Sequence, residues 1–113
     1  PYTTILGHAT GRLLLMRKGY PIDYKKIIDA CASNGVVIEV NANPRRLDMD
    51  WKWLNYAQQK DVMISINPDA HDMNEILFMQ YGVHMARKAG IAKDMVLNTF
   101  RLEKIEAFFK NKK

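Results

Sequence analysis

What the sequence lacks already limits what the protein can be. Its only cysteine, Cys31, cannot form a disulfide within the chain, and its place on the apolar side of a predicted helix indicates a buried small side chain. No run of about 18 apolar residues is present, and the first residues have no basic stretch followed by an apolar one, so neither a membrane span nor a signal peptide is predicted. We therefore expect a cytoplasmic protein without a membrane partner.

The composition is that of one globular domain. The chain has 113 residues, of which 48% are apolar and 26% charged, enough for one hydrophobic core. The formal net charge of +5 permits a polyanionic partner without requiring one. Much of the excess lies near the C-terminus, where a solvated helix is favoured over a nucleic-acid contact. The basic residues of that tail are Arg101, Lys104, Lys110, Lys112 and Lys113, against Glu103 and Glu106.

The first two thirds of the chain alternate between strand-like and helix-like segments. Residues 4–8, 36–40 and 62–66 are short runs rich in apolar residues and are predicted to be strands. Between them, Asp23 can cap a helix over residues 23–33 that stops at Asn34-Gly35, and Asp48 or Asp50 can begin a second helix that ends near Lys60. The second strand, with little alternation, is typical of a strand buried on both faces of a parallel sheet.

The last third is predicted to be helical. Helical segments are expected over residues 73–79, 83–89, 93–97 and 102–109, with Gly82 and Gly90 as breaks. The whole pattern predicts an α/β fold with parallel strands and right-handed crossovers. The carboxyl ends of the three strands then reach one rim, which His8, Asn41 and Asp69 should share.

Two motifs at that rim could bind a metal. His8 follows the first strand, and Asp69 and His71 follow the third, so that two imidazoles and a carboxylate, a set suited to a transition metal, could meet. The alternatives are a histidine satisfied by backbone at position 8 and, for the Asp69 pair, an N-cap aspartate with a bystander histidine for the helix after Asp72. Parallel α/β folds hold their chemistry where strands end, which favours the functional interpretation.

Basic and amide side chains accompany these residues. Arg12, in a loop with two glycines, offers a fork of donors to a phosphate. Asn43, Arg45 and Arg46 could orient a phosphodiester, but Asn-Pro is also an ordinary turn signal, and Arg46 with Asp48 could be a surface ion pair. Both interpretations stay open.

Two further ionisable residues have less distinctive surroundings. Glu39 lies within the second strand and points either toward the interior of the rim or toward a lysine outside it. His84 lies in a predicted helix beside Arg87 and Lys88, and we expect it to face solvent.

Taken in order, the motifs resemble a known domain. Residues 5–12 (ILGHATGR), 38–48 (IEVNANPRRLD) and 64–71 (ISINPDAH) resemble the last third to half of the polymerase and histidinol phosphatase (PHP) domain. Residues 81–83 (YGV) and 96–99 (VLNT) bring the chain closest to the PHP domain of bacterial family X DNA polymerases. The resemblance covers nearly the whole chain.

The resemblance implies a fold and a chemistry. The fold is the C-terminal half of a distorted (β/α)7 barrel, with about three parallel strands, flanking helices and a helical C-terminus. The rim of such a barrel holds up to three zinc or manganese ions, and ligand roles are carried over onto His8, Asp69 and His71. The implied activity is 3′-5′ exonuclease or phosphatase chemistry on DNA ends in a DNA-repair polymerase. Arg12, Asn43, Arg45 and Arg46 are expected to face phosphate from their positions alone.

The chain also departs from the family pattern. Ala9 and Pro68 stand where the related polymerases usually have proline and threonine, but neither change removes a ligand. The family's first histidines and its glutamate would lie before Pro1, and no methionine begins the chain, so we expect a piece of a longer protein. Residues 1–99 would be the PHP part and residues 100–113 a basic C-terminal helix and tail.

Such a piece should be inactive, or nearly so, by itself and should self-associate through its open edges. Two alternatives remain for the longer protein. One is a phosphatase acting on a small phosphate monoester, similar to histidinol phosphatase. The other is a non-catalytic PHP module that braces a polymerase.

Overall fold

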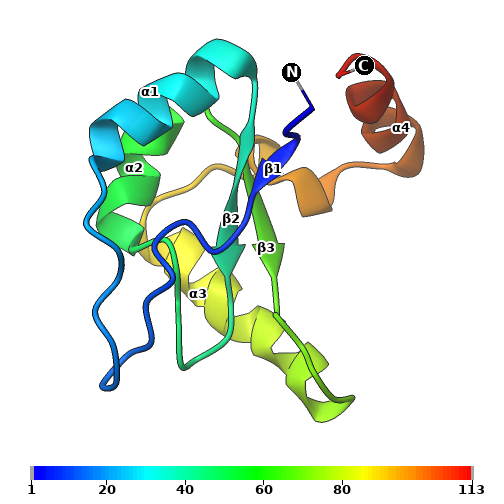
Figure 1. Ribbon diagram of the computed structural model, residues 1–113. Helices are drawn as coiled ribbons and strands as arrows, with labels where there is room; N and C mark the ends of the chain where they lie inside the picture. Colours follow the sequence, from blue (N-terminus) through cyan, green and yellow to red (C-terminus); the bar gives the residue numbers. More distant parts are fainter. Residues whose placement is uncertain (1, 113) are drawn as a thin grey trace.

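The computed structural model of the protein describes residues 2–112 and contains one parallel sheet. Its three strands lie in the order β1 (Ile5–Leu6), β2 (Val37–Asn41) and β3 (Ile64–Asn67), and all point the same way (Figure 1). Glu39 of β2 pairs in register with Ser65 of β3, and Asn41 with Asn67. The predicted α/β fold with three parallel strands is therefore confirmed, although the first strand is shorter than predicted.

Helices α1 (Tyr24–Asn34) and α2 (Trp51–Gln59) connect the strands and lie side by side (Figure 1). The Asp23 carboxylate accepts the N–H of Lys26 and so caps α1, and Gly35 ends the helix with φ of 59°. Of the two candidate caps for the second helix, Asp50 is the one used, because its carboxylate accepts the N–H of Lys52.

The two faces of the sheet differ in polarity. Side chains alternate along a strand, so Ile38 and Val40 of β2 share a face with Ile64 and Ile66 of β3. These four are buried in the hydrophobic core, together with Cys31 of α1, as predicted. The opposite face carries polar residues toward the carboxyl ends of the strands, namely Glu39, Asn41, Ser65 and Asn67.

The segment after β3 differs from the prediction. It forms 3-10 helix η1 (Asn74–Phe78) and then α3 (Met79–Lys88), which runs through Gly82 without a break. Gly82 is buried against Ile66 and Ala42, so close packing rather than chain reversal explains the glycine. Gly90, with φ of 71°, does follow the end of α3, as expected.

The chain then passes through two short 3-10 helices, η2 (Lys93–Met95) and η3 (Leu97–Thr99), to helix α4 (Leu102–Lys110). Helix α4 stands apart from α1, α2 and α3 (Figure 1). The domain boundary predicted at residue 99 stays a prediction. Within residues 2–112, no helix has the length and apolar character needed to cross a membrane.

Candidate functional site

His8 lies in the loop after β1 with an unusual backbone conformation. Its φ is 48°, in the left-handed region that residues other than glycine seldom adopt. Its N–H donates to Oε2 of Glu39 at 2.9 Å, and its ring accepts a further contact from Asn41, with 3.0 Å between Nδ1 and the amide Nδ2. The side chain is half exposed, so the ring is fixed on one side and open on the other.

Asp69 reaches the same place from the end of β3. It also has a left-handed backbone, with φ of 54°, and its side chain is only 15% exposed. Oδ1 lies 3.8 Å from Nε2 of His8, and Oδ2 lies 3.1 Å from Nε of Arg46. The predicted meeting of His8, Asn41 and Asp69 at one rim is therefore confirmed, and strained backbone at both ionisable residues is typical of functional sites.

His71 does not join this pair. Its Nδ1 lies 2.8 Å from the backbone oxygen of Asp69 and 3.8 Å from Oε2 of Glu75, and its side chain is largely exposed. The capping role considered for Asp69 belongs instead to Asp72, whose Oδ1 accepts the N–H groups of Asn74 and Glu75. Of the three predicted metal ligands, the structure brings together two.

Glu39 is a site residue that we did not predict. The sequence left open whether its side chain faces the interior of the rim or a lysine outside it. It points to the rim, where Oε1 accepts from Nδ2 of Asn67 at 2.9 Å and Oε2 accepts from the N–H of His8. Ser65 extends this network by donating to Oδ1 of Asn67. The sequence did hold a signal, because Glu39 and Asn41 are two residues apart on one strand and so share a face.

Arg12 has a different role from the predicted one. Its Nε donates to the backbone oxygen of Arg46, its Nη1 pairs with Asp50 at 3.0 Å, and its Nη2 donates to the oxygen of Leu47. All three nitrogens are thus engaged with the loop after β2. Arg12 holds that loop in place, and these contacts give no support to phosphate binding by its guanidinium.

The loop after β2 carries the other predicted phosphate contacts. Asn43 is buried, and its Oδ1 accepts the N–H of Arg45. The Asn43 side chain therefore stabilises the turn, which was one of its two interpretations. Arg46 bonds to Asp69, whereas the Arg45 side chain makes no hydrogen bond or ion pair with residues 2–112. A hollow beside them is lined by Leu13, Asn43, Arg45, Arg46, Asp69, His71 and Glu75. The same cavity is therefore bordered by two arginines and by both predicted ligands that follow β3, namely Arg45, Arg46, Asp69 and His71.

The suggested surface pair of Arg46 with Asp48 is wrong. Asp48 is 1% exposed, and its carboxylate accepts from the hydroxyl and N–H of Thr10 and from the N–H of Gly11, at 2.9 to 3.1 Å. Because Thr10 and Gly11 follow His8, this buried carboxylate fixes the loop that presents the imidazole. His84 is exposed on α3, as expected.

The residues fit a metal ion in part. An imidazole nitrogen and a carboxylate oxygen 3.8 Å apart can belong to one coordination sphere after a small movement, since zinc ligands of these types lie about 2 Å from the ion. Residues 2–112 nevertheless contain no group of three His, Cys, Asp or Glu side chains placed to hold an ion. His8 and Asp69 would be its ligands here, and further ligands are needed to complete a site.

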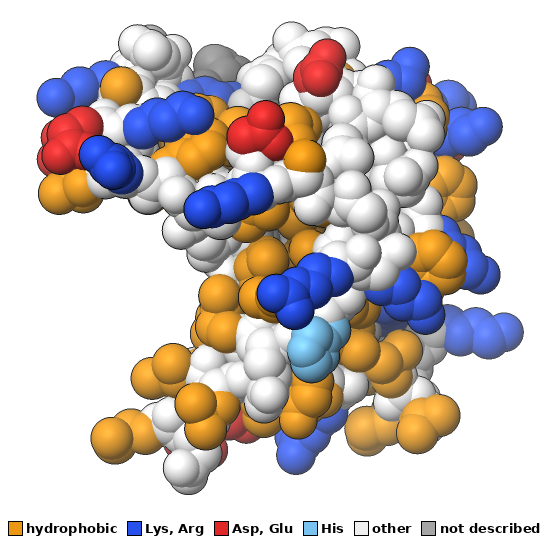
Figure 2. Space-filling model, turned by 180° about the vertical axis from the view of Figure 1, so that it is seen from behind, with side chains coloured by type: hydrophobic (Ala, Val, Ile, Leu, Met, Phe, Trp, Pro, Cys, Tyr) orange, Lys and Arg blue, Asp and Glu red, His pale blue; other side chains and the backbone are white. Residues whose placement is uncertain are grey.

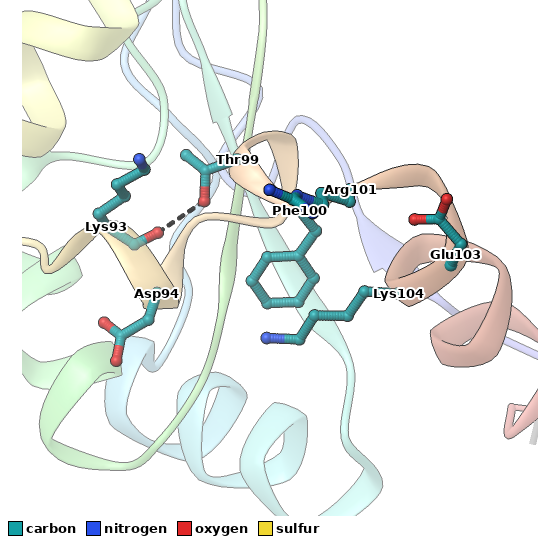
Figure 3. Close-up of a pocket in the computed structure, with 7 residues that line it drawn as sticks. All are labelled: Lys93, Asp94, Thr99, Phe100, Arg101, Glu103 and Lys104. Carbon is teal, nitrogen blue, oxygen red and sulfur yellow. Dashed lines mark hydrogen bonds between the residues drawn. The ribbon is translucent and has the colours of Figure 1, made fainter.

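A second hollow lies away from this rim. It is bordered by η2, η3 and the start of α4, and Lys104 lies over the ring of Phe100 at 3.6 Å from its centroid (Figure 3). It contains no histidine, and its Lys104-Phe100 contact stabilises the approach of α4 to η3. We assign it no chemistry.

Comparison with known proteins agrees with the motifs. Over 109 residues, 96% of this chain, the sequence is 38% identical to the DNA polymerase/3'-5' exonuclease PolX of Bacillus subtilis, of which it covers 19%. It is 30% identical over its full length to probable phosphatases of Thermoanaerobacter sp. and Thermoanaerobacter pseudethanolicus, covering 46% of each. No family model matches the chain. The chain thus spans less than half the length of these relatives, and the predicted resemblance to a family X DNA polymerase is confirmed, with the probable phosphatases in agreement with a PHP domain.

Proposed function

We propose that this chain, which resembles the PHP domain of family X DNA polymerases, is the C-terminal part of a metal-dependent phosphoesterase domain. The protein that contains it would act in DNA repair, with 3′-5′ exonuclease or phosphatase chemistry on DNA ends. The similarity to a polymerase/exonuclease over 96% of the chain supports DNA ends as the substrate. The reaction and the substrate are proposed for a protein longer than the chain described here, because every relative reported above is longer.

One observation carries the proposal. His8 and Asp69, from the loops after the two outer strands, come within 3.8 Å of each other above the carboxyl end of β2. Both have left-handed backbones, which cost about 1–3 kcal/mol each and persist when the surrounding structure enforces them.

The residues around the pair suit a phosphoester. Zinc or manganese, when bound, would neutralise phosphoryl oxygens and lower the pKa of a water molecule. Arg45 and Arg46 border the same hollow as Asp69, and Arg45 has no partner within residues 2–112, so its guanidinium is available to a phosphate. Arg46 holds the Asp69 carboxylate in place through its bond to Oδ2, leaving Oδ1 toward His8.

A small phosphate monoester is the second candidate substrate. The matches to two probable phosphatases over the full chain favour it, and the hollow beside Arg45 would serve a monoester and a DNA end alike. A non-catalytic module that braces a polymerase is the third candidate, and it would hold no metal ion at the rim.

Metal binding by the chain tests the ligand assignment. We expect zinc or manganese to bind with modest affinity in calorimetric titrations, because two ligands are in place. His8→Ala and Asp69→Asn should each weaken binding by more than about tenfold, equivalent to about 1.4 kcal/mol. His84→Ala is the matched control, since it removes an exposed imidazole far along the chain on α3. Equal binding by all four proteins would contradict the site.

Activity separates the three candidates. In the full-length protein, metal-dependent release of nucleotides from a DNA 3′ end, lost in Asp69→Asn, supports the exonuclease. Faster hydrolysis of a small monoester than of DNA favours the phosphatase, and absence of bound metal favours the brace. The isolated chain should show little activity, and full nuclease activity that is abolished by His71→Ala would refute the incomplete site.

A further inference from the structure

The hydrogen bonds around His8 determine which ring nitrogen carries its proton. Oδ1 of Asn41 accepts the N–H of Asn43 at 3.1 Å, so the amide nitrogen of Asn41 is the atom that faces His8. This nitrogen lies 3.0 Å from Nδ1 of His8. An amide nitrogen can only donate, so Nδ1 is the acceptor.

The proton of a neutral imidazole is then on Nε2. This nitrogen faces Oδ1 of Asp69 at 3.8 Å, in the direction where a cation would bind. A protonated Nε2 cannot ligate a metal, because its lone pair is used. The hydrogen bonds seen here therefore hold His8 in the tautomer that cannot bind a metal through Nε2.

A second partner for Nδ1 lies close by. Oε2 of Glu39 is 3.7 Å from it, slightly too far for a hydrogen bond, and a small rotation of the half-exposed ring would bring the two atoms within hydrogen-bond distance. The Glu39 side chain is 12% exposed and is held by Asn67 and by the N–H of His8, so its position is fixed. A carboxylate held in this way is the usual acceptor for the second N–H of a metal-bound histidine.

We propose that Asn41 and Glu39 are alternative partners that select the tautomer of His8. Asn41 donates to Nδ1 in the metal-free protein, and Glu39 accepts from Nδ1–H when Nε2 faces a cation. Glu39 is thus a positioning residue that acts through His8. This inference rests on the proposed function, since it assumes that a cation occupies the space between His8 and Asp69.

The structure explains why both partners are needed. Asn41 is fully buried at the end of β2. In the tautomer that carries its proton on Nδ1, the Nδ1–H of His8 and the amide N–H of Asn41 would face and repel each other. Binding a cation therefore costs the Asn41 hydrogen bond, and the charged acceptor offered by Glu39 compensates for that loss. Among residues 2–112, Glu39 is the carboxylate near Nδ1 of His8, at 3.7 Å. Without it, the Nδ1–H of the metal-binding tautomer would face only the donor of Asn41.

Nitrogen NMR of the His8 ring tests the proposal directly. Metal-free protein should show the Nε2–H tautomer, and saturating zinc should change it to Nδ1–H. Asn41→Asp replaces a donor by an acceptor of the same shape, so it should produce the Nδ1–H tautomer without metal. The new carboxylate can still accept the N–H of Asn43, which preserves the turn.

Glu39→Gln tests the second partner. Zinc affinity measured by calorimetry should fall by about ten- to a hundredfold, the usual effect of removing a carboxylate that orients a metal-binding histidine. Glu106→Gln, on the exposed surface of α4, is the matched control and should leave both the tautomer and the affinity unchanged. Backbone amide spectra verify that each variant folds, and Asn41→Asp added to Glu39→Gln should restore part of the affinity.

The results separate this inference from the proposed function. Wild-type protein that binds zinc while keeping Nε2–H, or Glu39→Gln protein that binds zinc as tightly as wild type, overturns the inference alone. Failure of the wild-type chain to bind zinc overturns the assignment of His8 and Asp69 as ligands in this chain and, with it, the role of Glu39. Asn41→Asp decides the assignment of Nδ1 in either case, since it needs no metal.

Discussion

At the scale of single residues, buried polar groups determine the shape of the rim. Asp48 joins the loop after β1 to the loop after β2 through three hydrogen bonds to Thr10 and Gly11. Arg12 adds a second connection between the same loops. Asp48 and Arg12 therefore hold the loop that carries His8 against the loop after β2.

Removal of the Asp48 carboxylate should destabilise the fold. Asp48→Ala leaves buried donors of Thr10 and Gly11 unpaired, at a cost of about 3 kcal/mol in the free energy of unfolding. Urea denaturation followed by circular dichroism measures it. Asp94→Ala, at an exposed position in η2, serves as the control and should change stability by less than about 0.5 kcal/mol. A similar stability for both variants would show that the buried carboxylate is dispensable.

Asp50 should make stability depend on acid pH. Partial burial raises the pKa of its carboxyl, but hydrogen bonds from the Lys52 N–H and from Arg12 outweigh this, and the pKa lies below its ordinary value of 3.8. A lowered pKa stabilises the folded state above pH 3.8, and the contribution is lost as the pH falls through the folded pKa. Asn still caps a helix, so Asp50→Asn should cost up to about 1 kcal/mol at pH 7, chiefly from the partly exposed Arg12 pair.

The difference between wild type and Asp50→Asn should shrink as the pH falls below 3.8 and through the lowered pKa of Asp50, because the wild-type carboxyl then becomes protonated as well. Thermal unfolding at several pH values measures it. A difference that is the same at pH 7 and pH 2 would mean that the charge of Asp50 has no part in stability.

At the scale of elements, close packing rather than helix propensity decides the course of α3. A Cβ at Gly82 would lie 2.4 Å from Cγ2 of Ile66 and 2.8 Å from Cβ of Ala42. The glycine therefore lets α3 approach the end of β2 and β3, where the loops of the rim begin. Glycine lowers the stability of the helix, but its lack of a side chain lets α3 pack closely against the sheet.

Gly82→Ala should destabilise the protein, although the same change in an exposed helix is stabilising by up to about 1 kcal/mol. Steric overlap with Ile66 and Ala42 should lower the free energy of unfolding by about 1–3 kcal/mol. Gln80→Ala, at an exposed position of α3, is the control for helix propensity and should be neutral or slightly stabilising. An increase in stability of Gly82→Ala would show that α3 can move away from the sheet at no cost.

The outer edge of β3 is covered by a side chain. The amide of Asn98 accepts the N–H of Ile66 at 2.7 Å and donates to its oxygen at 2.9 Å, so it imitates a neighbouring strand. Val96 forms an isolated bridge to Ile64 on the same edge. Further strand pairing on this edge is thereby blocked, a common means of avoiding aggregation.

At the scale of the whole molecule, one side is hollowed. Seen from behind, a recess with apolar side chains separates an upper and a lower part of the surface (Figure 2). Large apolar residues are exposed in several segments outside the core, including Leu15 and Met16, Met73, Ile76 and Leu77, and Leu102. Such surface on a small chain favours association.

We accordingly predict self-association of the isolated chain. Sedimentation measured from micromolar to millimolar concentration should show an average mass that rises above that of the 13.1 kDa monomer. Leu77→Glu, which places a charge at an exposed apolar position, should reduce the effect, whereas Glu106→Gln should not. A strictly monomeric species at the highest concentration would contradict the prediction.

The sequence by itself determined the order of the three strands and of the two helices between them, the parallel sheet, the cap Asp23 and the meeting of His8 with Asp69. These follow from local rules, since periodicity, capping side chains and right-handed crossovers act over short stretches of chain. The resemblance to known proteins could also be predicted from the sequence, because the motifs and their order along the chain need no knowledge of the fold.

Only the tertiary structure decided which polar groups face one another. Arg12 binds a loop 34 to 38 residues away, Asp48 is buried rather than exposed, and Glu39 joins His8 from another strand. His71 likewise turns to Glu75 and away from His8. Side-chain partners over such separations depend on the packing of loops, which local sequence does not encode. The sequence therefore determined that a rim of this kind exists, and the fold decided which residues form its site.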